Sequence, residues 1–150
     1  MNAETGKILD QAAKRGAQAK LPYAGAVSLQ EAHQLHSSGA ARIVDVRTEP
    51  EWLYVGRIPG SDHIEWRVYG AQQPNPDFLA RLESTVKKDE VVLFLCRSAQ
   101  RSHSAATIAA KAGFMHAYNI LEGFEGNLDA DNHRGTTGGW RKAGLPWEQS

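Results

Sequence analysis

Apolar positions along the chain form several short runs with strand character. Residues 42–46 are a short run rich in β-branched side chains, and residues 118–121 form a second short run near the C-terminal third of the chain. Residues 91–95 are apolar at every position, which predicts a central strand covered on both faces of a parallel sheet. The pattern therefore predicts at least three buried strands.

Segments with helical spacing lie between these runs. Ser28 and Glu31 have the spacing of a capping box, and apolar residues follow them at helical intervals. Three further helical segments are predicted, at 48–56, from residue 75 and from residue 102, where alanines and an isoleucine recur at positions i, i+3, i+4 and i+7. Strands that alternate with helices predict an α/β domain of three layers, with a mainly parallel central sheet flanked by helices.

The first 25 residues have a different pattern. Ile8 and Leu9 are the only large apolar residues before Leu21, so a helix here would have little apolar stripe to dock. We expect residues 1–25 to form a poorly anchored N-terminal arm that is partly disordered or helical, and residues 26–150 to form one domain.

Composition and charge exclude several classes of function. Lys+Arg and Asp+Glu both number 17 in 150 residues, and this balance argues against a general nucleic-acid-binding protein. The longest apolar run is far too short to span a membrane, and the N-terminus lacks the pattern of a signal peptide. We therefore expect a cytoplasmic protein without a nucleic-acid or membrane partner.

The one cysteine has unusual neighbours. A single thiol rules out an internal disulfide and a zinc site made of several thiolates, and the six histidines show no metal-binding spacing. Cys96 directly follows the predicted central strand and precedes a predicted helix, where free N–H groups and the helix dipole favour the thiolate. Two arginines flank it, so the loop is predicted to bind a small anion beside a nucleophile. The loop reads Cys96-Arg97-Ser98-Ala99-Gln100-Arg101-Ser102.

These residues resemble those of a known family, the rhodanese-like sulfurtransferases. The segment 96–102 is similar to the family's active-site loop, and residues 45–61 and 138–147 resemble its N-terminal and C-terminal signatures. The family often has histidine where Arg57 stands and alanine where Ser61 stands. The three motifs occur in the family's order, and the resemblance covers roughly residues 27–147.

The resemblance implies a reaction and its participants. Cys96 would take the outer sulfur from thiosulfate or a related small sulfur-containing anion, carry it as a persulfide, and pass it to a thiol, to cyanide or to a protein sulfur acceptor. The loop amides, together with Arg97 and Arg101, would hold the donor and the persulfide. No metal or organic cofactor is expected, because the thiol itself carries the group.

Two other uses of the same thiol compete with this one. The related dual-specificity phosphatases and arsenate reductases leave five residues between cysteine and arginine, whereas four separate Cys96 from Arg101, and the five-residue spacing would end on Ser102. Alternatively, the protein could be a persulfide carrier or sensor that a partner protein discharges, and the sequence leaves that alternative open.

Other polar residues are assigned supporting roles. Asp45 and Arg47 follow the predicted strand at 42–46, and we interpret them as an ion pair that braces the loops near the site. His103 is predicted to be a surface residue in the first turn of its helix, and Trp66 is a candidate for the pocket wall. Trp140 and Trp147 are predicted to pin the C-terminal segment across the domain.

Overall fold

The computed structural model describes residues 2–150 and contains one parallel sheet. Within these residues, five strands pair in the order β1-β5-β4-β2-β3, and every pair is parallel. The strands are β1 (Gly25–Val27), β2 (Arg42–Asp45), β3 (Asp62–His63), β4 (Val92–Leu95) and β5 (Ala117–Ile120). The predicted parallel sheet is confirmed, and the apolar run at 91–95 supplies its central strand.

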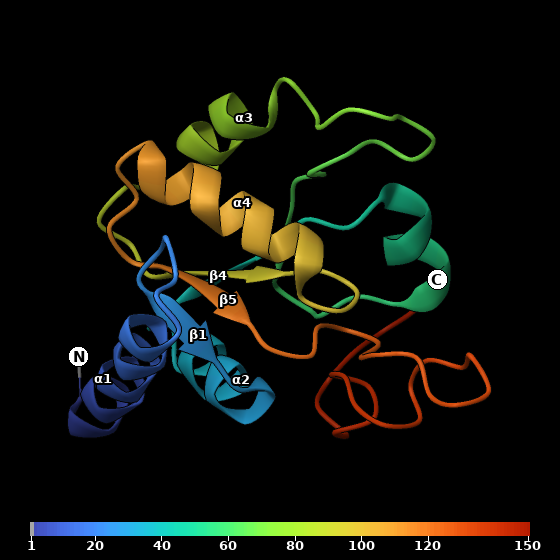
Figure 1. Cartoon of the computed structure of the whole chain (residues 1–150), viewed down its shortest axis with the longest axis horizontal. Coiled ribbons are helices and arrows are strands. Elements are labelled where there is room, and N and C mark those ends of the chain that lie inside the picture. Colours follow the sequence, from blue (N-terminus) through green and yellow to red (C-terminus); the bar gives the residue numbers. More distant parts are fainter. Residues whose placement is uncertain (1) are drawn as a thin grey trace.

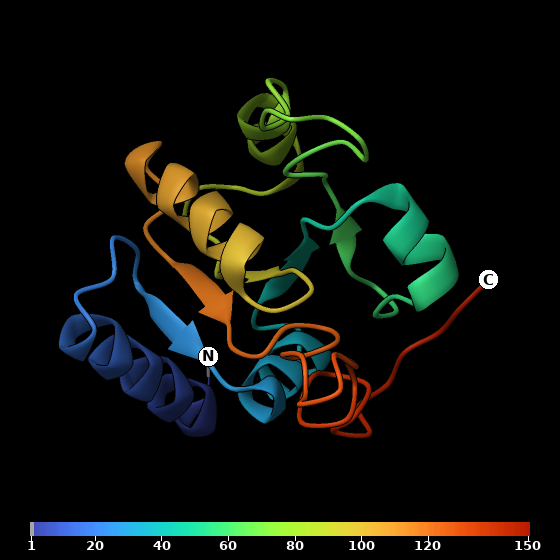
Figure 2. The same cartoon turned by 45° about the vertical axis from the view of Figure 1, so that its right-hand side comes forward.

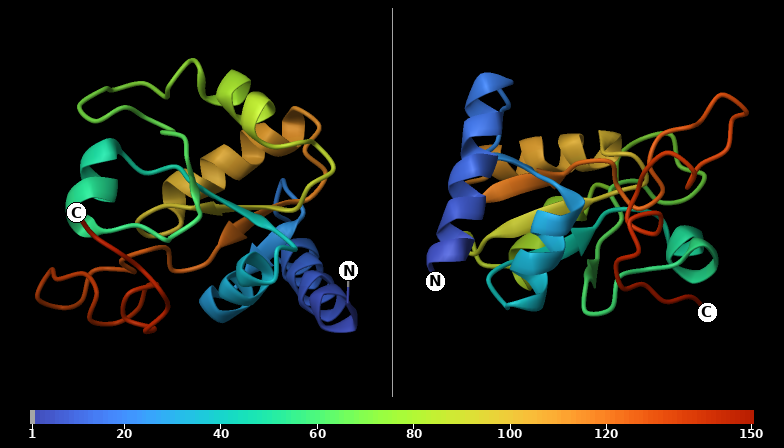
Figure 3. Two further views of the ribbon diagram at one scale, coloured as in Figure 1. Left: turned by 180° about the vertical axis from the view of Figure 1, so that it is seen from behind. Right: turned by 90° about the horizontal axis from the view of Figure 1, so that it is seen from below.

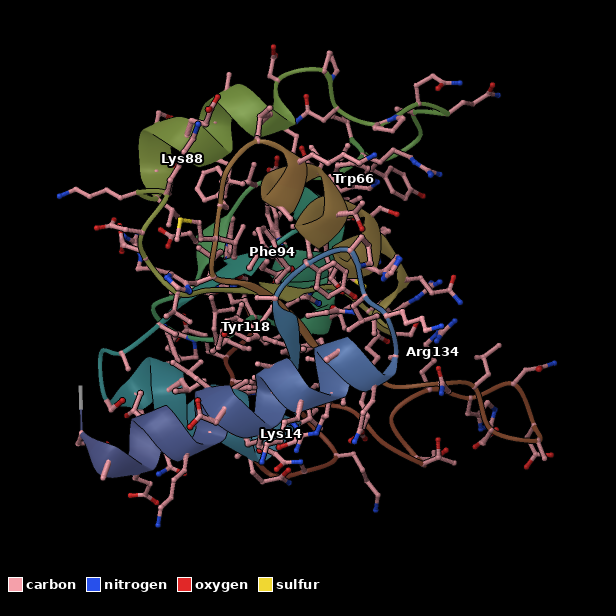
Figure 4. All side chains as sticks on the ribbon, turned by 60° about the vertical axis from the view of Figure 1, so that its left-hand side comes forward. Lys14, Trp66, Lys88, Phe94, Tyr118 and Arg134 are labelled. Atoms are coloured by element: carbon pink, nitrogen blue, oxygen red, sulfur yellow. The ribbon has the colours of Figure 1, made fainter. Side chains whose placement is uncertain are left out.

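Helices cover both faces of the sheet and complete three layers (Figures 1 and 3). Helices α1 (Ala3–Gln18) and α2 (Leu29–Ser37) pack on one face, and α3 (Phe78–Thr85) and α4 (Gln100–Lys111) pack on the other. Phe94 and Tyr118 belong to the two separate apolar clusters, and Figure 4 shows them between α4 and α1. The predicted three-layer α/β architecture is therefore present.

The expectation of a poorly anchored N-terminal arm was wrong, because small residues dock α1. Ala12 is fully buried, and a Cβ on Gly16 would lie 2.7 Å from the Ala24 carbonyl oxygen. The helix therefore approaches β1 backbone to backbone, without the large apolar stripe that the sequence lacks. Arg15 also binds Glu31 of α2 through a salt bridge of 2.6 Å.

The remaining predicted helices agree with the structure to different degrees. The capping box at Ser28 and Glu31 is present, with both reciprocal hydrogen bonds. The short helix predicted at 48–56 is a single π-helical turn, η1 (Glu51–Val55), which Gly56 ends with φ 124°. Helix α4 begins at Gln100, two residues earlier than predicted.

The long segment after β5 lies across the carboxyl end of the sheet, next to η1 (Figure 2). Trp140 is fully buried in the cluster beneath this segment and donates a hydrogen bond to the Pro146 carbonyl at 2.8 Å. Trp147 packs more loosely, with 40% of its surface exposed, and its ring lies against Gly56. Among the described residues, no helix has both the length and the apolar character that crossing a bilayer requires.

Candidate active site

The single thiol lies at the carboxyl end of the central strand. Cys96 directly follows β4, and its 1% exposed surface borders a pocket. Ala99 has φ 77°, a left-handed conformation that turns the chain from this loop into α4. The strand, the tight loop and the helix therefore place a sulfur atom beneath the N-terminus of a helix of 12 residues.

The loop that follows β5 is hydrogen-bonded to the backbone of the cysteine loop. The N–H groups of Phe124 and Glu125 donate hydrogen bonds to the carbonyls of Cys96 and Arg97, at 2.8 and 3.0 Å. Gly123 makes this approach possible, because its φ is 73° and a Cβ there would lie 2.6 Å from the Cys96 carbonyl oxygen. The carbonyl groups at the start of the loop are thus occupied by backbone donors.

The N–H groups of the cysteine loop have no such partners. Among the described residues, none of the backbone amides of residues 97–102 donates a hydrogen bond to another group. The first amides of a helix are normally free, and here those of the preceding loop join them. Together with the positive end of the helix dipole, they form a site that favours a bound anion.

A buried hydrogen-bond network supports the sulfur atom from below. Cys96 Sγ lies 3.3 Å from Ser102 Oγ, and the Ser102 hydroxyl donates to Asn119 Oδ1 at 2.6 Å. Asn119 in turn donates from its side-chain amide to the Ala99 carbonyl at 3.1 Å. The network joins β5, α4 and the loop, so it fixes both the thiol and the left-handed residue that shapes the loop.

Arg101 is held by a carboxylate and does not extend freely into the pocket. Its two terminal nitrogens bind the two carboxylate oxygens of Glu51 at 2.8 and 3.0 Å. Burial by itself raises the pKa of Glu51, but the hydrogen bonds and charge of Arg101, with further hydrogen bonds from Thr48, outweigh it and lower that pKa to about 2. The pKa of Arg101 is raised, because Glu51 outweighs the opposing effect of burial. We therefore correct the expectation that Arg101 offers its guanidinium group to the donor.

An open pocket with a volume of about 770 Å³ lies above the thiol. Five residues of the predicted loop line it, namely Cys96, Arg97, Ser98, Gln100 and Arg101. Ala99 and Ser102 do not line it; Ser102 is fully buried behind the sulfur atom, so its contact is with Cys96 itself. The sequence-based set therefore mixes residues that face the pocket with residues that support the loop.

Several lining residues were missed by sequence reasoning. Arg67, Tyr69 and Arg134 come from long segments without regular structure, and Tyr54 comes from η1. Figure 4 labels Arg134 on the segment that follows β5. No local signal marks such residues, because only the folded chain brings these segments to the carboxyl end of the sheet.

Asp45 and Arg47 form a fully buried ion pair. Arg47 Nη2 lies 2.7 Å from Asp45 Oδ2, and the same nitrogen donates to the Gly56 carbonyl at 2.7 Å. The guanidinium carbon also lies 4.2 Å from the centre of the Phe124 ring. The pair therefore joins β2, the end of η1 and the loop behind Cys96, and neither residue lines the pocket.

Two further candidates lie outside the pocket. His103 is exposed and its Nδ1 lies 2.7 Å from the hydroxyl of Tyr23, whereas Trp66 packs edge-on against Phe78. Trp66 lines a separate apolar groove between α3 and α4 instead of the wall above Cys96. Among the described residues, no group of three His, Cys, Asp or Glu side chains could hold a metal ion.

Most of the chain matches a known protein family. The family model named rhodanese-like domain matches residues 28–130. The chain belongs to the rhodanese-like family. The matched region of this rhodanese-like domain contains most of the sheet, the cysteine loop and the segment behind that loop.

Relatives and solved structures agree with this assignment. The crystal structure of Rv0390 from Mycobacterium tuberculosis has a TM-score of 0.76 and 43% identity, covering 85% of this chain and 99% of that one. The uncharacterized protein RP600 of Rickettsia prowazekii is 40% identical over 110 residues, or 72% of this chain and 83% of the relative. The thiosulfate sulfurtransferase GlpE of Pseudomonas aeruginosa is 31% identical over 99 residues, or 66% of this chain and 79% of the relative. The resemblance seen in the motifs is thereby confirmed.

Proposed function

We propose that this rhodanese-like protein transfers sulfane sulfur through a persulfide on Cys96. One observation carries the proposal: the only thiol of the chain lies beneath the unpartnered amides of residues 97–102 and borders a pocket that arginines line. A thiolate is the reactive form of cysteine, and unpartnered amides can donate hydrogen bonds to the negatively charged sulfur during transfer. The similarity to GlpE, a thiosulfate sulfurtransferase, supports thiosulfate as a donor.

In the first half of the reaction, the Cys96 thiolate attacks the outer sulfur of thiosulfate. A new S–S bond forms between Cys96 and that sulfur, and the S–S bond within thiosulfate breaks. Sulfite leaves with the electron pair of the broken bond. Arg97 is the loop arginine that makes no salt bridge with the described residues, so it binds the sulfonate, while the loop amides hold the outer sulfur of the persulfide.

In the second half, a thiophilic acceptor collects the sulfur. With cyanide as acceptor, its carbon attacks the outer sulfur, thiocyanate leaves, and the electron pair of the broken S–S bond returns to Cys96 as a thiolate. No metal, redox cofactor or added proton is needed, because each step exchanges one bond to sulfur for another. The Ser102 hydroxyl, 3.3 Å from Cys96 Sγ, contacts the sulfur atom through both halves.

The geometry argues against phosphoryl transfer at the same cysteine. A phosphatase loop needs an arginine that is free to bind the oxygens of the phosphoryl group. Arg101 has both terminal nitrogens bound to Glu51, and the loop has one residue fewer than the phosphatase pattern requires. Sulfur transfer needs space for only one added atom, which agrees with the shorter loop.

Steady-state kinetics with thiosulfate and cyanide test the proposal. We expect the wild-type protein to form thiocyanate with ping-pong kinetics, because sulfite leaves before cyanide reacts. Cys96→Ser should abolish turnover, and Arg81→Gln, which removes an exposed charge on α3, should retain it. A Cys96→Ser variant that remains as active as wild type would refute the persulfide route.

A further inference from the structure

The pocket above Cys96 is far larger than the small anion of the proposed reaction requires. Thiosulfate has only five non-hydrogen atoms, whereas a volume of about 770 Å³ lies within the range of sites that enclose much larger organic ligands. Arg97 and the amides of the cysteine loop suffice to hold the sulfonate and the outer sulfur of thiosulfate. Most of the pocket is therefore left for a second, larger molecule.

The charges that line the pocket define the character of that molecule. The lining contains four arginines and two glutamates, and Glu51 is already paired with Arg101. Arg67, Arg97 and Arg134 form no salt bridge with any of residues 2–150. Arg134 donates a hydrogen bond to the Gly126 carbonyl at 2.8 Å, which holds it in place. Glu125 is the other glutamate of the lining, so the three arginines exceed the remaining carboxylate by two charges. Three guanidinium groups around one pocket favour a ligand with several negative charges.

The rim of the pocket adds aromatic contact surface. Tyr54 and Tyr69 line the pocket from two different segments, and each is 74% exposed. Val68 precedes Tyr69, also lines the pocket and is about half exposed. Tyrosine and arginine are the residues that most often dominate binding to proteins and peptides. An inorganic anion would not contact this rim, whereas an extended peptide chain would.

From these observations we propose that the sulfur acceptor is a cysteine in an acidic peptide segment of a partner protein. This inference rests on the proposed persulfide of Cys96. The acceptor's thiolate attacks the outer sulfur of that persulfide, the S–S bond to Cys96 breaks, and Cys96 leaves as a thiolate while the acceptor becomes a persulfide. Carboxylates on either side of the acceptor cysteine bind Arg67 and Arg134, and the chain packs against Tyr54 and Tyr69.

The test compares three acceptors on protein that thiosulfate has loaded with sulfur. They are cyanide, the blocked peptide Asp-Glu-Cys-Glu-Asp and the blocked neutral peptide Asn-Gln-Cys-Gln-Asn. Mass spectrometry follows the loss of sulfur from Cys96, and each peptide rate is divided by that peptide's rate with a small neutral disulfide to correct for thiol reactivity. We expect the corrected rate of the acidic peptide to exceed that of the neutral one by about tenfold at low salt, since two or three partly exposed ion pairs are together worth about that factor.

Two variants and a matched control locate the effect. In Arg67→Gln and Arg134→Gln the ratio of acidic to neutral rates should fall towards one, and salt should reduce it in the wild type. Arg81→Gln removes an exposed charge outside the pocket and should keep the ratio. Equal corrected rates for the two peptides, or a preference that survives both pocket variants, would overturn the acceptor assignment. Rapid discharge by cyanide in the same samples would show that the proposed function stands; protein that never loads sulfur would overturn both.

Discussion

Removing Arg47 should destabilise the fold severely, although the residue lies outside the pocket. Neither side chain of the Asp45–Arg47 pair is exposed, and Arg47 makes three hydrogen bonds to the Asp45 carboxylate and one to the Gly56 carbonyl. Its Nη1 has no hydrogen-bond partner among the described residues, and the guanidinium group lies against the Phe124 ring. In Arg47→Met the Asp45 carboxylate keeps only its hydrogen bond from the Arg47 backbone amide and has lost its buried cation.

The expected loss of unfolding free energy is about 3–5 kcal/mol, the usual consequence of leaving one partner of a buried ion pair behind. Domains of this size have about 5–15 kcal/mol in total, so the yield of folded protein should fall sharply. Urea denaturation measures the loss as a lower midpoint at constant slope. Sulfur transfer per folded molecule should change much less than stability, because Arg47 does not contact the pocket.

Arg42→Met is the matched control for this measurement. Arg42 also pairs with carboxylates, Asp62 at 2.8 Å and Glu90 at 3.5 Å, but 40% of its side chain is exposed. Water screens such pairs, so their loss should lower the unfolding free energy by about 1 kcal/mol. If Arg47→Met were no more destabilised than Arg42→Met, the interpretation of the buried pair as the brace behind the active-site loop would be refuted.

Three further predictions concern the loop and its ion pair. Gly123→Ala should lower the unfolding free energy by more than about 1 kcal/mol and impair sulfur loading, because φ is 73° and the added Cβ would meet the Cys96 carbonyl. Thermal melting measures the stability and mass spectrometry measures the loading. A variant as stable and as readily loaded as the wild type would contradict the role of Gly123 behind the cysteine loop. Glu51 is ionised at neutral pH with its pKa lowered to about 2 from an ordinary 4.5, so its stabilising effect is present above pH 4.5 and is lost as pH falls towards 2. Glu51→Gln should therefore flatten the acid limb of the stability curve in urea titrations, and an unchanged limb would count against the pairing with Arg101. Finally, an aryl phosphate should not be turned over measurably, and turnover that Cys96→Ser abolishes would revive the phosphatase alternative.

Much of the fold was predictable because its strongest signals are local. The apolar run at 91–95 and the capping box at Ser28 depend on neighbouring residues, and both appear in the structure. Strands β1 and β3 have three and two residues, too few to show a periodic pattern, so the sequence did not indicate them. The docking of α1 was missed because it depends on the small residues Ala12 and Gly16, which let the helix backbone approach β1 closely, and not on large apolar side chains.

The candidate site also has parts that the sequence predicted and parts that it did not. Cys96 and its loop follow a strong strand, so the sequence predicted their place at the carboxyl end of the sheet. The partner of Arg101 was not predictable, because Glu51 is 50 residues away and only the sheet topology brings η1 against the loop. The same holds for Arg67 and Arg134, whose segments have no regular structure and meet only in the folded pocket.

Intact-mass spectrometry after incubation with thiosulfate labelled in its outer sulfur tests whether Cys96 carries a persulfide. We expect the wild-type protein to gain one labelled sulfur atom, which peptide mapping should place on Cys96 and cyanide should remove. Cys96→Ala should gain nothing. Reduced, folded wild-type protein that stays at its original mass, or a label found at any other residue, would contradict sulfur transfer through Cys96.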